Sequence, residues 1–134
     1  IENMNIIIEE DLLANTTAMG ARMMENLAAL QEKHAVIGDV RGKGLLTAFE
    51  FMSDRATKAP LPKHLNAHQR FVDIAYDRGL IVYSRRTRDG LEGDHVLVCP
   101  PLILNGGHID ELIDGLDGAL AQLTQEIAPA MEAQ

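Results

Sequence analysis

Three arginines crowd one short stretch of the sequence, SRRTRDG, where Arg85, Arg86 and Arg88 fall within four consecutive positions. Like charges this close together repel one another unless carboxylates or an anionic ligand neutralise them. The planar guanidinium group holds a carboxylate through two parallel hydrogen bonds, so such a cluster is chemically suited to binding a small organic acid. These arginines are therefore the candidate substrate-binding residues of the chain.

The sequence also offers internal partners for this positive charge. Asp89, Glu92 and Asp94 follow the arginines within a few positions and could neutralise them as ion pairs. As a general expectation for a surface loop, this arrangement is slightly favoured over a carboxylate clamp. The residues alone leave both interpretations open.

Other residue types that often perform chemistry lack the necessary spacing. No HExxH, CxxC or paired-histidine motif is present, so no metal site is expected. Ser84 lacks the pattern of a nucleophile elbow, and Cys99 is interpreted as a buried, inert thiol. His95, within an expected strand, is interpreted as a hydrogen-bonded structural residue. We therefore assign no catalytic residue to this chain.

The glycine-rich stretch RGKGL, Arg41 to Leu45, resembles part of a phosphate loop but lacks the GxxxxGK[ST] spacing. Glycine marks unusual backbone geometry before it marks ligand binding. We expect a glycine turn between two strands, with Arg41 paired to a carboxylate.

The elements that must position these residues follow from hydrophobic periodicity and from glycine and proline breaks. We expect helices at 9–34 and 66–78 and a last helix that Asn105 caps, with Gly79 at the end of the second helix. Strands are expected near 36–40, at 45–52, 80–84 and 95–99, and loops at 53–65 and 85–94. This order predicts an α+β domain, a small, mostly antiparallel sheet covered by helices.

Composition restricts the class of protein. The chain has 134 residues, enough for one domain, and 20 acidic against 12 basic residues, a net charge of -8 that argues against nucleic-acid binding. No apolar run approaches the roughly 20 residues of a membrane span. A single cysteine excludes an internal disulfide and is typical of the cytoplasm. The start, IENMNIII, lacks a signal peptide and an initiator Met, so we expect a piece of a longer chain.

Three segments in order carry a family resemblance: VIGDVRGKGLLTAFEF, RGLIVYS after a helix, and DGLEGDHVLVCPPLIL before an amphipathic helix. Together they resemble the C-terminal small domain of class III (omega-type) aminotransferases, over nearly the whole chain. The resemblance implies a two-domain, fold-type I subunit that uses pyridoxal phosphate and works as a homodimer. Residues 1–134 would be the C-terminal small domain, without the large cofactor-binding domain.

The family's Schiff-base lysine lies in that large domain, and no lysine here occupies an equivalent place. The four lysines, Lys33, Lys43, Lys58 and Lys63, fall at a helix end, in the glycine turn and in a proline-bearing loop. We therefore expect no cofactor-binding residue in this chain, and no transamination by the chain alone.

The resemblance also implies a substrate class. The ornithine-type branch carries a carboxylate-binding arginine where this chain has Leu97, which argues against that branch. The amine–pyruvate branch has its arginine further upstream, near Arg85, Arg86 and Arg88. Arg86 or Arg88 is narrowly favoured over Arg85 as the equivalent residue. The implied reaction is ping-pong transfer of an amino group from an amine or omega-amino acid to a keto acid such as pyruvate. The alternative functions are a stand-alone module that binds an anionic metabolite and an oligomerisation module.

Overall fold

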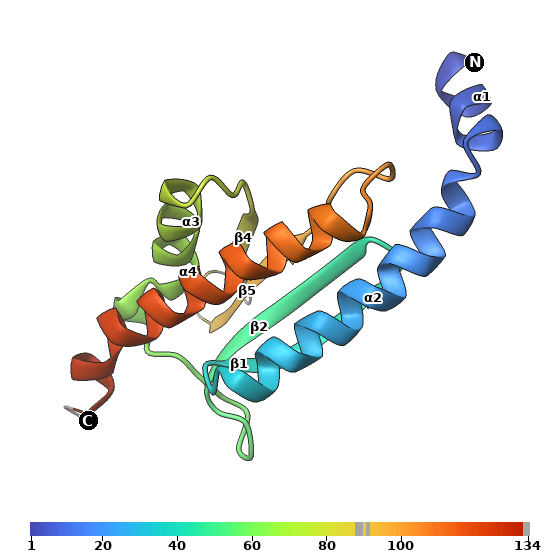
Figure 1. Ribbon diagram of the computed structural model, residues 1–134. Coiled ribbons are helices and arrows are strands. Elements are labelled where there is room, and N and C mark those ends of the chain that lie inside the picture. Colours follow the sequence, from blue (N-terminus) through green and yellow to red (C-terminus); the bar gives the residue numbers. More distant parts are fainter. Residues whose placement is uncertain (88–89, 91, 133–134) are drawn as a thin grey trace.

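An antiparallel sheet with helices on one side organises the chain (Figure 1). The computed structural model describes residues 1–87, 90 and 92–132. In chain order the elements are α1 (Glu2–Glu9), α2 (Leu12–Lys33), β1 (Ile37–Lys43), β2 (Leu46–Asp54), β3 (Ala59–Pro60), a 3-10 turn (Lys63–Leu65), α3 (Ala67–Asp77), β4 (Tyr83–Thr87), β5 (Glu92–Val98) and α4 (Gly106–Glu132). The main sheet has the order β1-β2-β5-β4, and β3 pairs with β2. The predicted α+β class is confirmed.

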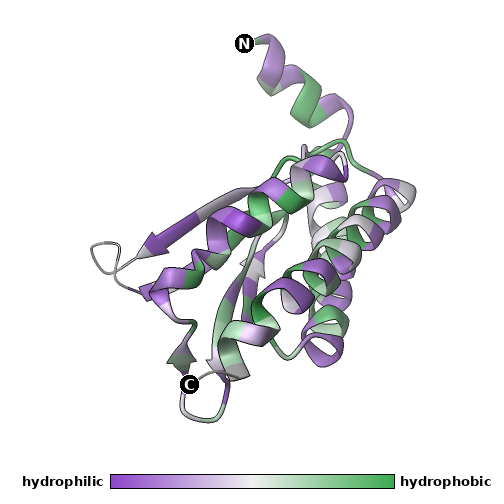
Figure 2. Cartoon of the chain, turned by 90° about the vertical axis from the view of Figure 1, so that its left-hand side faces the viewer, coloured by the Kyte–Doolittle hydropathy of each residue, from purple (hydrophilic) through white to green (hydrophobic). Residues whose placement is uncertain are grey.

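The first helical segment is divided into two helices. The pattern predicted one helix at 9–34, but α1 ends at Glu9 and α2 begins at Leu12, with Asp11 between them in the left-handed backbone region at φ 48°. Figure 2 shows α1 standing apart from the rest of the chain, and none of its residues is buried. By contrast, α2 buries Met23 and Leu27 completely, because its apolar stripe lies against the core.

The glycine-rich stretch forms the predicted hairpin turn between β1 and β2. Gly44 adopts a φ of 57°, which favours glycine, and a Cβ on Gly20 of α2 would lie 2.6 Å from the Gly44 backbone. Both positions thus let α2 approach the turn closely. Arg41 pairs with Glu50, Nη1 to Oε2 at 3.1 Å, and also contacts Asp39, so the predicted carboxylate partner is confirmed.

The core lies between the sheet and the helices α2, α3 and α4. At its centre Phe49, Phe51 and Phe71 form a mutual edge-to-face group, with each pair of ring centroids 5.5 Å apart. Edge-to-face packing aligns the positive ring edge with the negative ring face of its neighbour. This group joins β2 to α3 and so fixes the helix that lies beside β4.

The strand that carries the arginines begins later than predicted. Leu80 was expected in a strand, but its N–H donates to the Ala75 carbonyl oxygen at 2.9 Å, which extends the end of α3. Gly79, at a φ of 81°, provides the predicted helix end. The strand therefore starts at Tyr83, and Arg85 and Arg86 lie within β4 rather than in the predicted loop.

The last helix begins and packs as its sequence indicates. The side chain of Asn105 accepts a hydrogen bond from the His108 N–H at 3.1 Å, which confirms Asn105 as the cap. Asp117 of α4 reaches the end of α2, with its oxygens 2.6 Å from Lys33 Nζ and 2.6 Å from His34 Nε2. These two contacts hold α2 and α4 side by side, as Figure 1 shows.

In the part of the chain that the structure describes, none of the helices combines the length and the apolar character needed to cross a membrane.

Candidate functional site

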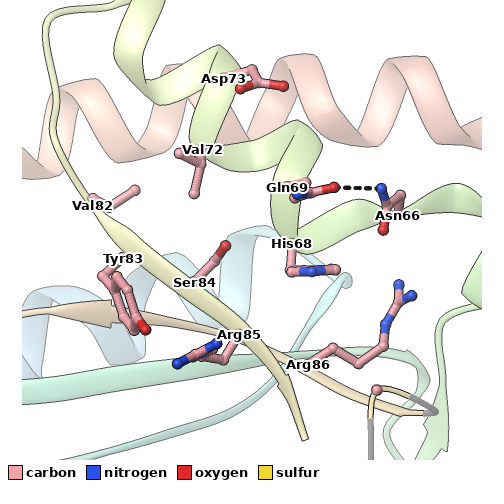
Figure 3. A pocket seen from close by; sticks show the side chains of 11 residues that line it. Asn66, His68, Gln69, Val72, Asp73, Val82, Tyr83, Ser84, Arg85 and Arg86 are labelled. Carbon is pink, nitrogen blue, oxygen red and sulfur yellow. Dashed lines mark hydrogen bonds between the residues drawn. The ribbon is translucent and has the colours of Figure 1, made fainter.

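Neighbouring arginines of β4 point to opposite faces of the sheet. Side chains alternate along a strand, and Arg85 pairs in register with His95 while Arg86 pairs with Asp94. Figure 3 shows Arg86 extending on the side of His68, whereas Arg85 lies beside Tyr83. We call the face under the helices, which includes Arg86 and Asp94, the helix-covered face.

The other face, which we call the open face, carries the alternate residues of the four paired strands. By register these include Asp39, Arg41, Ala48, Glu50, Tyr83, Arg85, His95 and Leu97.

On the helix-covered face, Arg86 makes a bidentate ion pair with Asp94. Arg86 Nε lies 2.5 Å from Asp94 Oδ1, and Arg86 Nη2 lies 2.9 Å from Oδ2. The side chains of Arg86 and Asp94 are only 9% and 4% exposed. Two parallel hydrogen bonds are the strongest arrangement of this pair, so the positive charge of Arg86 is already neutralised within the chain.

His68 of α3 is the third member of this cluster. Its Nδ1 lies 3.3 Å from Asp94 Oδ2, an electrostatic contact without hydrogen-bond geometry, and its backbone N–H donates to the same oxygen at 3.4 Å. Burial of Asp94 acts to raise its pKa, but the hydrogen bond from Arg86 and the charges of His68 and Arg86 outweigh burial. The net effect holds the pKa of Asp94 below its usual value. Asp94 therefore links β5, β4 and α3 as a carboxylate.

Arg85 has a different environment on the open face. Its side chain is exposed, and its guanidinium carbon lies 5.5 Å from the centre of the Tyr83 ring. This geometry permits a cation–π contact, which does not use the guanidinium N–H donors. Among the residues that the structure describes, no carboxylate lies within 4.0 Å of Arg85.

A cavity of about 720 Å³ lies between α3 and β4. It is lined by Asn66, His68, Gln69, Val72, Asp73, Val82, Tyr83, Ser84, Arg85, Arg86 and Gly90. Two of the three predicted arginines therefore border one cavity. Arg88, the third, lies outside the described residues.

The lysines provide a test of whether this chain could hold pyridoxal phosphate. That cofactor requires a lysine amine for its Schiff base. All four lysines, Lys33, Lys43, Lys58 and Lys63, are exposed, and none lines the cavity beside β4. Lys33 is moreover paired with Asp117. The cavity beside β4 therefore contains no lysine for the Schiff base of this cofactor.

Other predicted residues have clear places in the structure. His95 Nδ1 lies 3.0 Å from the Gly93 carbonyl oxygen, so its predicted structural hydrogen bond is confirmed. Cys99 is a free, exposed thiol, and the prediction that it is buried is wrong, because β5 ends at Val98 and leaves the next residue outside the core. Among the described residues no group of three His, Cys, Asp or Glu side chains could hold a metal ion.

The profile of the family "Aminotransferase class-III" matches residues 1–120. The chain belongs to the class-III aminotransferase family. One relative in this family is the hypotaurine/taurine–pyruvate aminotransferase of Paracoccus denitrificans, which is 44% identical over 92% of this chain and 26% of its own length. The chain thus spans about a quarter of this curated relative.

Solved structures of transaminases contain the same fold. A transaminase from the marine bacterium Virgibacillus superposes with a TM-score of 0.89 at 28% identity, over 94% of this chain and 28% of its own. A PLP-bound (internal aldimine) amine transaminase from an uncultivated Pseudomonas species superposes with a TM-score of 0.77 at 33% identity, over 89% of this chain and 25% of its own. The fold of this class-III aminotransferase chain is therefore that of one part of a transaminase subunit.

Three residues that surround the arginines of β4 were missed or only partly anticipated from the sequence. Asp94 was one of three acids expected to neutralise arginines, and the structure shows that it neutralises Arg86. His68 was missed, because it lies on α3, 26 residues before its partner Asp94. Tyr83 was also missed as a partner of Arg85, although the alternation in YSRRT places both side chains on one face.

Proposed function

We propose that the full-length protein is a pyridoxal phosphate-dependent aminotransferase that moves an amino group from an amine or omega-amino acid to a keto acid such as pyruvate. The family match over residues 1–120 carries this proposal. The relative from Paracoccus denitrificans, whose name gives hypotaurine or taurine and pyruvate as substrates, supports the choice of an omega-amino acid and pyruvate.

Residues 1–134 would be the C-terminal small domain of this enzyme. The chain covers 26% and 28% of the lengths of two relatives, which supports a large domain elsewhere in the polypeptide. Because the four lysines here are exposed and lie outside the cavity, that large domain would hold pyridoxal phosphate. The isolated chain would then neither bind the cofactor well nor transaminate.

The contribution of this chain would be substrate binding by its arginines. Arg85, Arg86 and Arg88 are the candidates, and a guanidinium group suits the carboxylate of a keto acid or an amino acid. Holding the acid in a fixed orientation near the reacting centre lowers the entropic part of the barrier. No residue of this chain would take part in the bond-breaking steps.

The partners and location follow from the same proposal. The enzyme would act on a small amine and a keto acid as a cytoplasmic homodimer, with neither nucleic acid nor membrane as a partner. The excess of acidic over basic residues supports the absence of nucleic acid, since phosphate backbones require clustered cations.

The test compares two purified proteins, the full-length protein and residues 1–134 alone. Each is incubated with pyridoxal phosphate, pyruvate and either β-alanine or taurine, and alanine formation is measured by chromatography. Alanine should form only with the full-length protein. Absence of transfer from every amine tested with the full-length protein would overturn the proposed function, and activity of residues 1–134 alone would overturn the proposed division of domains.

A further inference from the structure

Large apolar side chains that are exposed to solvent gather mainly at one end of the described chain. Figure 1 shows α1, the start of α2, the turn between β1 and β2 and the connection from β5 to α4 at this end. Six of these side chains, which we call the apolar end, are 37% to 72% exposed: Met4, Ile8, Leu13, Leu46, Leu102 and Ile103. Single exposed apolar residues are ordinary, but a group of them marks a surface that contacts another protein surface.

The backbone that carries the apolar end is held in place by contacts with α2. Asn15 Nδ2 donates to the carbonyl oxygens of Leu102 at 2.7 Å and of Leu104 at 3.0 Å, which fixes the connection before α4 against α2. The next residue, Thr16, lies so close to the turn between β1 and β2 that a Cβ on Gly44 would be 2.8 Å from its Cγ2. Two segments that are distant in sequence therefore converge on the first turns of α2. A surface fixed in this way loses little conformational entropy when a partner packs on it.

Helix α1 lacks the interactions that would stabilise it within the described chain. It has eight residues, no hydrogen bond from a side-chain cap and no buried residue. Isolated helices shorter than about 12 to 15 residues are marginal in water, and the left-handed backbone of Asp11 separates α1 from the longer α2. Met4 and Ile8, four residues apart, lie on the same face of α1. A surface that packs on this face would supply the stability that α1 lacks.

Acidic residues flank the apolar face of α1. Glu2, Glu9, Glu10 and Asp11 lie at its two ends, and among the residues that the structure describes no cation lies within 4.0 Å of their carboxylates. Protein interfaces combine an apolar centre with a polar rim, and opposite charges across the rim favour the correct partner. The surface that fits α1 is therefore apolar, with lysines or arginines around it.

We propose that the apolar end packs against the remaining part of the same polypeptide. The chain covers 26% and 28% of the lengths of two relatives, so most of the full-length protein lies outside this domain. A surface on the same polypeptide has a high effective concentration, whereas a second copy or another protein would have to associate from solution. This inference rests on the proposed division of the enzyme into two domains, and it names the side chains through which this domain meets the other.

The experiment measures hydrogen exchange in the full-length protein and in the variants Ile8→Ser, Ile103→Ser and Ile81→Ser. Isoleucine and serine have similar helix propensities, so Ile8→Ser removes an apolar contact without weakening the helix itself. Ile81→Ser is the matched control, because Ile81 is 90% exposed and lies outside the apolar end, in the connection between α3 and β4. Each rate is expressed relative to an unstructured peptide of the same sequence, and light scattering gives the mass of each assembly.

The amides at positions 5–10 of the parent protein should exchange at least about a hundredfold more slowly than in the unstructured peptide, because a packed α1 opens rarely. Ile8→Ser should reduce this protection about tenfold or more, the effect of losing one buried isoleucine side chain. Ile103→Ser should reduce the protection of the Leu104 amide, which donates to the Pro101 carbonyl oxygen, by a similar factor. Ile81→Ser should leave both values unchanged, and all four proteins should have the same mass.

Unprotected α1 amides in the parent protein would overturn the proposal, and so would unchanged protection in Ile8→Ser and Ile103→Ser or an equal loss in Ile81→Ser. A smaller assembly in Ile8→Ser would assign the surface to a second copy of the chain and would also overturn it. None of these measurements needs transamination. Failure of the parent protein to transfer any amino group would therefore overturn the proposed function and leave the assignment of the apolar end to the exchange rates.

Discussion

The helix-covered face and the open face of the sheet give their arginines opposite environments. On the helix-covered face, the charge of Arg86 is buried and matched by Asp94, next to an aromatic core. On the open face, Arg85 stays exposed beside Tyr83, which is 52% exposed itself. The difference teaches that strand alternation separates neighbouring like charges. One side chain is buried in an ion pair, and the next stays exposed to solvent.

The largest effect should come from the aromatic centre of the helix-covered face. Phe71→Ala removes a fully buried ring from the edge-to-face group and should lower the free energy of unfolding by about 4 kcal/mol. Tyr83→Ala, on the open face, should lower it by less than about 1 kcal/mol. Both values are measured by unfolding the full-length protein in urea, with hydrogen exchange of the β2 and α3 amides as the probe. Equal losses would contradict the contrast between the two faces.

The next effect concerns the ion pair itself. Arg86→Ala leaves Asp94 buried without its guanidinium partner, so the free energy of local opening of β4 and β5 should fall by about 3 kcal/mol. Arg85→Ala serves as the control and should change it by less than about 0.5 kcal/mol, as surface substitutions do. Hydrogen exchange of the β4 and β5 amides reports the opening. A larger loss for Arg85→Ala than for Arg86→Ala would reverse the assigned roles.

Acid should weaken the helix-covered face through Asp94. Because the pKa of Asp94 is lower in the folded than in the unfolded chain, its carboxylate stabilises the fold above its unfolded pKa of about 4, and this contribution is lost as the pH falls further. Opening of β4 and β5 is measured at pH 6 and pH 3 in the parent protein and in Asp94→Asn. The pH dependence should be weaker in the variant. The same dependence in both proteins would show that other carboxylates, Asp117 among them, account for it.

The smallest effect should come from the ion pairs of the open face. Arg41 is 54% exposed, and its partners Asp39 and Glu50 also contact solvent, so Arg41→Ala should lower the free energy of unfolding by about 0.5 kcal/mol. High salt should abolish the difference between this variant and the parent protein, because screening weakens exposed pairs. A loss as large as that of Arg86→Ala would show that the open face is covered in the full-length protein.

The elements with strong periodic or turn signals were predictable from the sequence. The stripe of α4, the Asn105 cap and the Gly44 turn each depend on residues close together in the chain, and the structure places them as predicted. The boundaries near α1 and β4 were not predictable. Asp11 adopts a left-handed backbone without glycine, and Leu80 is held by a hydrogen bond to the end of α3, neither of which a hydrophobic pattern reveals.

The candidate site was predictable in its residue type but not in its organisation. The arginine cluster and the acids that follow it are visible in the sequence, and so is the resemblance to class-III aminotransferases. The choice of Asp94 over its neighbours, and the approach of His68, depend on how α3 packs beside β4. Assigning the arginines to a loop also concealed their alternation, since only a strand sends adjacent side chains to opposite faces.

Because two adjacent arginines of β4 lie on opposite faces, their position in the strand register decides which of them is buried and which is exposed. A single residue inserted ahead of Arg85 would exchange the two side chains without altering the composition of the segment, because a one-residue slip turns every side chain of a strand over. Asp94 would then meet Arg85, and Arg86 would lie on the open face one position further along the strand.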